Sequence, residues 1–202
     1  MPEDKPTLTL DYKGAGDPYG YLSGVEGYEL PQEWVENMEV PELHSTRIIA
    51  SYNQAGFERS GAYMQPIFLD PEYGALTMAQ REFIGVVVSA VNACPTCLII
   101  HSHKLGELIG DHGRARRIAI NYRAVGLSRQ ERAIADYCVK LTEQPGRMEA
   151  ADVQSLRDTG LSDEEIYYVI ETAAVFNLTN RMTSGYGMRP DDDFMASIVP
   201  NT

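Results

Sequence analysis

The chain has 202 residues, of which 44% are hydrophobic and 23% charged, and its formal net charge is −12. This is the balance of an ordinary globular protein, long enough to bury a core without disulfide or metal staples. So negative a surface repels a phosphate backbone, and nucleic-acid binding is therefore not expected. Three cysteines are too few for a disulfide framework, and the two that lie three residues apart point to redox or metal chemistry instead.

Charged residues occur throughout the first 25 positions without an apolar segment, so the sequence predicts no secretory signal peptide. The longest apolar run, residues 83–91, is too short to cross a bilayer. We therefore expect a cytoplasmic protein with no membrane partner, in a compartment where thiols stay reduced.

Residues 1–40 are predicted to form an extended N-terminal arm, because the first thirty positions are rich in Gly, Pro and Tyr. A tyrosine-rich arm on a helical domain suggests self-association, so we expect a homo-oligomer. The remainder, 41–202, is expected to form a single helical domain, since it contains no internal repeat and no low-complexity tract.

From residue 41 onward apolar residues recur at helical spacing, and the one β-branched run, 86–88, falls inside a helical window. Three helix starts carry a capping box, in which a hydroxyl pairs with a Glu or Gln three residues later: Thr77 with Gln80, Ser128 with Glu131, and Ser162 with Glu165. Gly160 is placed for a left-handed C-cap. The predicted helices span 41–54, 57–65, 77–92, 95–109, 113–123, 128–144, 149–159 and 162–184. The sequence therefore predicts an all-α fold.

The segment from 92 to 103 carries the chemistry. Pro95 favours the first position of a helix, which makes Cys94 its N-cap and Cys97 its third residue. Free amides and the helix dipole favour a thiolate there, so Cys97 is a candidate nucleophile. Cys94, Cys97 and His101 stand at i, i+3 and i+7 on one face. The two cysteines are thus near enough to form a disulfide, and His101 is in reach to take or return a proton.

Glu82 belongs to the preceding predicted helix. If the two helices form a hairpin around 92–94, Glu82 lies about 15 Å back along the first and His101 about 10 Å along the second. The two side chains could then face each other. An ionised Glu82 would hold the tautomer of His101 and raise its basicity, which completes a set of nucleophile, base and orienting group.

Four residues stand at fixed offsets: eleven residues separate Glu82 from Cys94, two separate Cys94 from Cys97, and three separate Cys97 from His101. This spacing resembles the active-site signature of the alkylhydroperoxidase-D-like branch of the carboxymuconolactone decarboxylase superfamily. The segment 160–166, followed by Phe176-Asn177 and Asn180-Arg181, is similar to the C-terminal half of its peroxidase-related proteins. The resemblance covers about residues 40–195.

The resemblance implies a helical bundle, oligomeric assembly and thiol-based peroxide reduction without a cofactor. It implies that Cys97 attacks the peroxide, that Cys94 resolves the sulfenic acid into a disulfide, and that Glu82 and His101 relay protons. An external thiol or disulfide reductant would then restore the pair. The chain departs at Thr96, where the best-known members place a histidine, and this weakens the transfer of their full proton relay and substrate. The decarboxylase branch lacks the cysteine pair, so lactone decarboxylation is disfavoured.

Zinc is the rival interpretation of two cysteines near histidines. His103 points about 200° away from His101 around a helix, so one ion cannot take both histidines together with Cys94 and Cys97. A site of the two cysteines and His101 with Glu82 or water remains open. In that alternative the protein is a non-catalytic helical oligomer that binds zinc or senses oxidants. His103 is expected at the surface or an interface.

The third cysteine, Cys138, falls on the apolar stripe of the predicted helix 128–144. It is expected to behave as a small buried hydrophobic residue.

Overall fold

The structure is a computed structural model that describes residues 20–22, 50–190, 195 and 198. Within these ranges the chain is helical and contains no strand, which confirms the all-α prediction. The helices are α3 (Gln54–Leu69), α4 (Met78–Val91), α5 (Pro95–Ile109), α6 (His112–Asn121), α7 (Arg129–Glu143), α8 (Ala150–Arg157) and α9 (Asp163–Tyr186), with 3-10 turns η1 (Tyr122–Ala124) and η2 (Pro145–Arg147).

Helix α4 is buried on every side and forms the centre of the fold. All nine residues from 81 to 89 are buried, and α3, α5, α6, α7 and α9 pack against this helix. A helix that is apolar nearly all round has to be enclosed, which confirms that the β-branched run 86–88 belongs to a buried helix. Arg81 and Glu82 are carried into the interior by the same helix.

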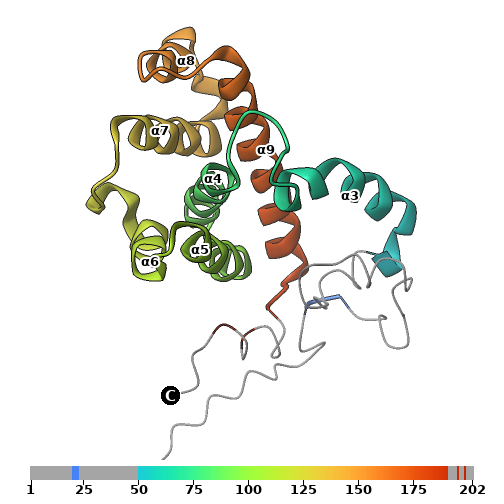
Figure 1. Ribbon diagram of the computed structural model, residues 1–202. Helices are drawn as coiled ribbons and strands as arrows, with labels where there is room; N and C mark the ends of the chain where they lie inside the picture. Colours follow the sequence, from blue (N-terminus) through green and yellow to red (C-terminus); the bar gives the residue numbers. More distant parts are fainter. Residues whose placement is uncertain (1–19, 23–49, 191–194, 196–197, 199–202) are drawn as a thin grey trace, which may run out of the picture.

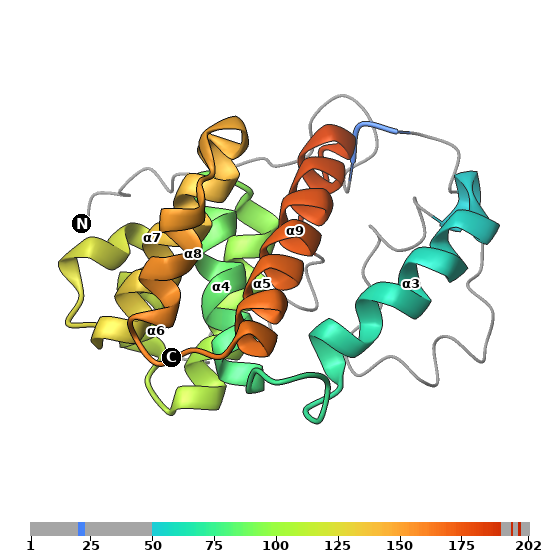
Figure 2. The ribbon, with the colours of Figure 1, turned by 90° about the horizontal axis from the view of Figure 1, so that it is seen from above.

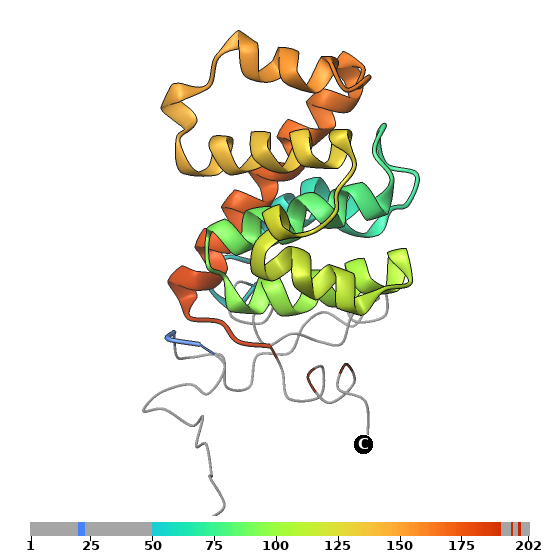
Figure 3. The ribbon, with the colours of Figure 1, turned by 90° about the vertical axis from the view of Figure 1, so that its left-hand side faces the viewer.

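The other helices are layered around α4. Figure 3 shows α8, α7, α4 and α5 stacked in that order, with α6 beside α5. Figure 1 and Figure 2 place α9 against α4, with most of α3 on the far side of α9. None of the described helices is long and apolar enough to cross a membrane.

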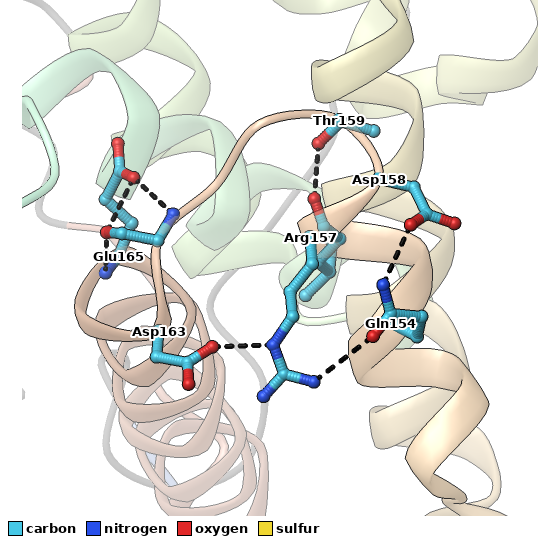
Figure 4. Close-up of polar contacts among 8 residues, drawn as sticks. Gln154, Arg157, Asp158, Thr159, Asp163 and Glu165 are labelled. Carbon is cyan, nitrogen blue, oxygen red and sulfur yellow. Dashed lines mark hydrogen bonds and ion pairs between the residues drawn. The ribbon is translucent and has the colours of Figure 1, made fainter.

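The predicted capping boxes at Thr77, Ser128 and Ser162 are all present, with both reciprocal hydrogen bonds formed. Figure 4 shows the last of these through Glu165. Gly160 has the expected left-handed backbone, with φ of +95°. At the start of α8 the Asp152 carboxylate accepts from the Glu149 amide at 2.7 Å, a contact that was not predicted because the N-cap there is a glutamate rather than a hydroxyl residue.

Helix α3 is longer than the predicted 57–65. It begins after Asn53, whose side chain accepts a hydrogen bond from the Gly56 amide, and it continues through Pro66 to Leu69. A proline usually ends a helix, because it lacks an N–H and disfavours the helical conformation of the residue before it. Here a partner from another helix satisfies the last carbonyls of α3, and this is information that the local sequence does not carry.

That partner is the buried guanidinium of Arg81. It donates hydrogen bonds to the carbonyls of Pro66 at 3.0 Å, Ile67 at 2.9 Å and Asp70 at 2.6 Å. A cation at the negative end of a helix is favourable, and the carbonyls of Pro66 and Asp70 accept from Arg81 in addition to the amides of Asp70 and Tyr73. Arg81 thus fixes the end of α3 against the start of α4.

Two sequence predictions fall mainly outside the described residues: the helix over 41–54 and the arm over 1–40. Of the first, positions 50–52 are helical and Asn53 interrupts the helix. Of the second, residues 20–22 are described, and the Tyr21 amide donates to the Tyr186 carbonyl at the end of α9. The division into arm and domain stays a prediction.

Replacing Arg81 tests the junction between α3 and α4. Arg81→Met removes three hydrogen bonds to carbonyls, so we expect the free energy of unfolding to fall by about 3 kcal/mol in urea titrations. Arg157→Met is the control, because Arg157 makes an exposed ion pair with Asp163 (Figure 4) and should leave the unfolding midpoint unchanged. Equal midpoints for the two variants would contradict this role of Arg81.

Candidate functional site

The site is built on the tight turn between α4 and α5. Helix α4 ends at Val91, Ala93 adopts a left-handed backbone with φ of 50°, and the Cys94 amide donates to the Ser89 carbonyl at 3.1 Å. Pro95 then opens α5 with Cys94 as its N-cap, as predicted. The turn folds α5 back along α4, which is the hairpin that the sequence indicated.

Cys94 and Cys97 are both reduced and buried, with their sulfurs 2.7 Å apart. Cys97 is the third residue of α5, as expected from the position of Pro95. A disulfide bond is about 2.05 Å long, so the sulfurs would need to move little if an oxidant removed two electrons from the pair. Cys138 is also free and fully buried, as expected, and burial raises its pKa to about 12.

The two thiols titrate as a pair. A hydrogen bond from Cys97 lowers the pKa of Cys94 to about 6 against the opposing effect of burial, and Ser184 adds to the lowering. Cys94 in turn raises the pKa of Cys97, burial raises it further, and hydrogen bonds from Thr183 and Asn180 offset only part of the rise. One proton is thus lost readily and the second is held strongly.

The lowered pKa therefore belongs to Cys94, whereas the sequence predicted it for Cys97. The helix N-terminus favours a thiolate at both positions. Since two negative charges at this separation repel each other strongly, only one of the sulfurs ionises, and hydrogen bonds from the side chain and the amide of Cys97 favour the charge on Cys94.

Glu82 and His101 are brought together across the hairpin. The Nδ1 atom of His101 lies 2.7 Å from Oε2 of Glu82, whose side chain is only 2% exposed. Burial alone would raise the pKa of Glu82, but His101 and Lys104 more than offset it and hold that pKa below its usual value. The Glu82 carboxyl is therefore ionised, and it fixes the orientation of the imidazole.

Two aromatic rings hold His101 from the other sides. Its ring centroid is 5.9 Å from that of Phe68 on α3 and 4.6 Å from that of Phe176 on α9. Phe176 reaches this place because position 85 is glycine: a Cβ there would lie 2.1 Å from the ring of Phe176. The imidazole is thus partly enclosed, with 16% of its side chain exposed.

Helix α9 supplies polar neighbours that the sequence analysis did not assign to the site. Asn180, Thr183 and Ser184 face the cysteines. The buried Asn180 amide also donates to the Ser89 hydroxyl at 3.1 Å and accepts from Asn92 at 3.0 Å. The sequence contains one signal for them: these three polar residues stand at i, i+3 and i+4 near the end of α9, whose earlier turns pack in the core.

Lys104 is a second residue that the sequence analysis missed. Its Nζ lies 3.3 Å from Oε1 of Glu82 and also donates to the carbonyl of Phe68. Lys104 stands one turn beyond His101 and two beyond Cys97, so its position on the same helical face was the available signal.

Thr96 and His103 lie apart from this arrangement. Thr96 is buried, and its hydroxyl donates to the Met188 carbonyl at 2.6 Å, which ties the segment after α9 to the start of α5. His103 is half-buried, pairs with Glu107 at 3.3 Å and stacks on His112. In the part of the chain that the structure describes, no three His, Cys, Asp or Glu side chains are grouped to hold a metal ion.

Comparison with solved structures identifies the family. An uncharacterized peroxidase-related protein from Ralstonia eutropha JMP134, described as an alkylhydroperoxidase AhpD core, is 30% identical over 78% of this chain and 82% of its own, with a TM-score of 0.69. An uncharacterized peroxidase-related protein from Silicibacter sp. TM1040 is 25% identical over 92% of this chain and 99% of its own, with a TM-score of 0.80.

The chain therefore belongs to the alkylhydroperoxidase-D-like family and lies among its peroxidase-related proteins. A debrominase with 12% identity over 78% of this chain and 83% of its own has a TM-score of 0.64, which shows the shared fold alone. No family model matches the sequence, and no curated protein matches it either.

The titration of the cysteine pair is directly measurable. The ultraviolet absorbance of the thiolate should rise with pH around a midpoint of about 6, because the hydrogen bond from Cys97 lowers the pKa of Cys94. The rise should correspond to one thiolate and should persist in Cys138→Ser. Absorbance that develops only near the ordinary cysteine pKa of about 8.5 would contradict the shared-proton arrangement.

Proposed function

We propose that this chain is a thiol-dependent peroxidase that reduces hydroperoxides, including alkyl hydroperoxides, through Cys94 and Cys97. The observation that carries the proposal is the pair of reduced sulfurs 2.7 Å apart at the start of α5, with the hydrogen-bonded Glu82 and His101 beside them. Membership of a family with peroxidase-related members supports it. The nucleophile, a resolving thiol, a base and an orienting carboxylate all come from one helical hairpin.

The chemistry takes place in two steps. The Cys97 thiolate attacks the outer oxygen of the peroxide, the O–O bond breaks, and an alcohol leaves once its oxygen has taken a proton. Cys97 is then a sulfenic acid, and attack by the Cys94 sulfur releases water and forms the disulfide. Two electrons from an external dithiol restore the pair.

His101 and Glu82 handle the proton in this proposal. His101 takes the proton that the cysteine pair releases and returns it to the leaving oxygen, while Glu82 keeps the ring in position. The contact of 2.7 Å between the two residues and the aromatic enclosure of the ring support this assignment.

Access favours Cys97 as the attacking sulfur, although the resting charge lies on Cys94. Cys94 is fully buried, whereas Cys97 retains 6% exposure and lies one helical turn from His101. The two sulfurs are in hydrogen-bond contact, so in this proposal the proton of Cys97 passes to Cys94 when the peroxide binds, and Cys97 becomes the thiolate. We therefore propose Cys97 as the nucleophile and Cys94 as the resolving residue.

We also propose that the protein is a cytoplasmic homo-oligomer whose other partners are the hydroperoxide and the external reductant. Large apolar side chains on its surface support self-association, since Ile120 is 84% exposed and Tyr21 is 80% exposed.

Serine variants test the chemistry and assign the sulfurs. Cys94→Ser and Cys97→Ser should each abolish peroxide turnover with an added dithiol, whereas Cys138→Ser should keep it, because Cys138 lies on α7 outside the site. With peroxide and a sulfenic-acid trap, Cys94→Ser should form an adduct on Cys97, located by mass spectrometry. Turnover by both single variants would contradict the proposed function, and an adduct found only on Cys94 in Cys97→Ser would exchange the two roles.

A further inference from the structure

The buried carboxylate of Glu82 is shared between two cationic partners from α5. His101 contacts Oε2 at 2.7 Å, and Lys104 contacts Oε1 at 3.3 Å. An imidazole can act as a base by accepting a proton, whereas a lysine ammonium supplies a fixed positive charge. The sequence resemblance assigns a role to Glu82 and His101 and none to Lys104.

A carboxylate buried this deeply needs a compensating positive charge. If His101 were its one close cationic partner, the ion pair would favour the protonated imidazole, and His101 could not accept a proton near neutral pH. Lys104 supplies the charge in its place. The low pKa of Glu82 has contributions from both partners.

Lys104 is also held firmly in this position. Its ammonium donates to the Phe68 carbonyl in the last turn of α3, where a cation is favoured by the helix dipole. The ring of Phe68 packs on His101. Residue Phe68 therefore contacts Lys104 through its carbonyl and the imidazole through its ring.

We propose that Lys104 is a positioning residue that keeps Glu82 ionised without a proton on His101, and so leaves the imidazole free to act as the base. This inference rests on the proposed peroxidase function. The role belongs to the charge of Lys104 rather than to its bulk, because Lys104 acts on His101 through the carboxylate between them.

Among the described residues, the charged groups near His101 apart from Lys104 are Glu82, the Cys94 thiolate and, beside Glu82, Arg81. Helices α3 and α9 present the uncharged rings of Phe68 and Phe176. Helix α4 presents Glu82, and the turn and the first turn of α5 present Cys94 and Cys97. Arg81 adds a positive charge near Glu82, but its hydrogen bonds go to the carbonyls at the end of α3.

The decisive measurement is the NMR titration of the His101 ring in the full-length protein, with the signal assigned by its loss in His101→Gln. In Lys104→Gln, which keeps a hydrogen-bond donor but no charge, His101 should hold its proton to a pH at least about one unit higher than in the wild type. Lys104→Arg keeps the charge and should restore the wild-type midpoint. Lys140→Gln is the matched control, because Lys140 forms an ion pair with Asp152 between α7 and α8.

Turnover with hydroperoxide separates this inference from the function on which it rests. The acidic limb of the pH–rate profile should move upward by the same amount in Lys104→Gln and return in Lys104→Arg. An unmoved His101 titration in Lys104→Gln overturns the role of Lys104, even if peroxidase activity is present. A wild type without peroxidase activity overturns the proposed function, while the ring titration still decides the electrostatic role. Lys104→Met gives a second neutral variant, with the same expectation, if the glutamine variant does not fold.

Discussion

The charge of Glu82, held inside the central helix, is the constraint on which the rest of the site depends. An ionised carboxylate at 2% exposure is tolerated only because His101 and Lys104 contact its two oxygens. These contacts join α4 to α5, and Lys104 extends the connection to the last turn of α3. The contacts that compensate the buried charge of Glu82 thus hold α3, α4 and α5 together around the imidazole of His101.

The same residues of α4 determine both the packing of the core and the geometry of the site. Helix α4 is enclosed by five neighbours, and it carries Glu82 inward with the apolar residues that fill the centre. Gly85 lets Phe176 approach α4 closely enough to contact His101. A larger residue at position 85 would therefore displace Phe176 and with it His101, the proposed base.

The cysteine pair combines a lowered pKa at Cys94 with burial of both sulfurs. The start of α5 favours a thiolate, and hydrogen bonds from Ser184 to Cys94 and from Asn180 and Thr183 to Cys97 lower the pKa of each thiol further. The bond from Thr96 to the Met188 carbonyl holds the chain after α9 close to this turn. Position 96 therefore contributes to the architecture of the site.

Local signals in the sequence were sufficient for most of the helices and for the centre of the site. Capping boxes mark helix starts because their hydrogen bonds form within four residues, and Pro95 placed both cysteines for a similarly local reason. The contact between Glu82 and His101 could be predicted from the rise per residue of two helices joined by one short turn. The tertiary structure alone decided that α3 continues through Pro66 and that Lys104 and Asn180 join the site. Each of these depends on atoms from helices distant in the chain, and the free energy of a buried charge or carbonyl is set by whatever partners the fold brings to it.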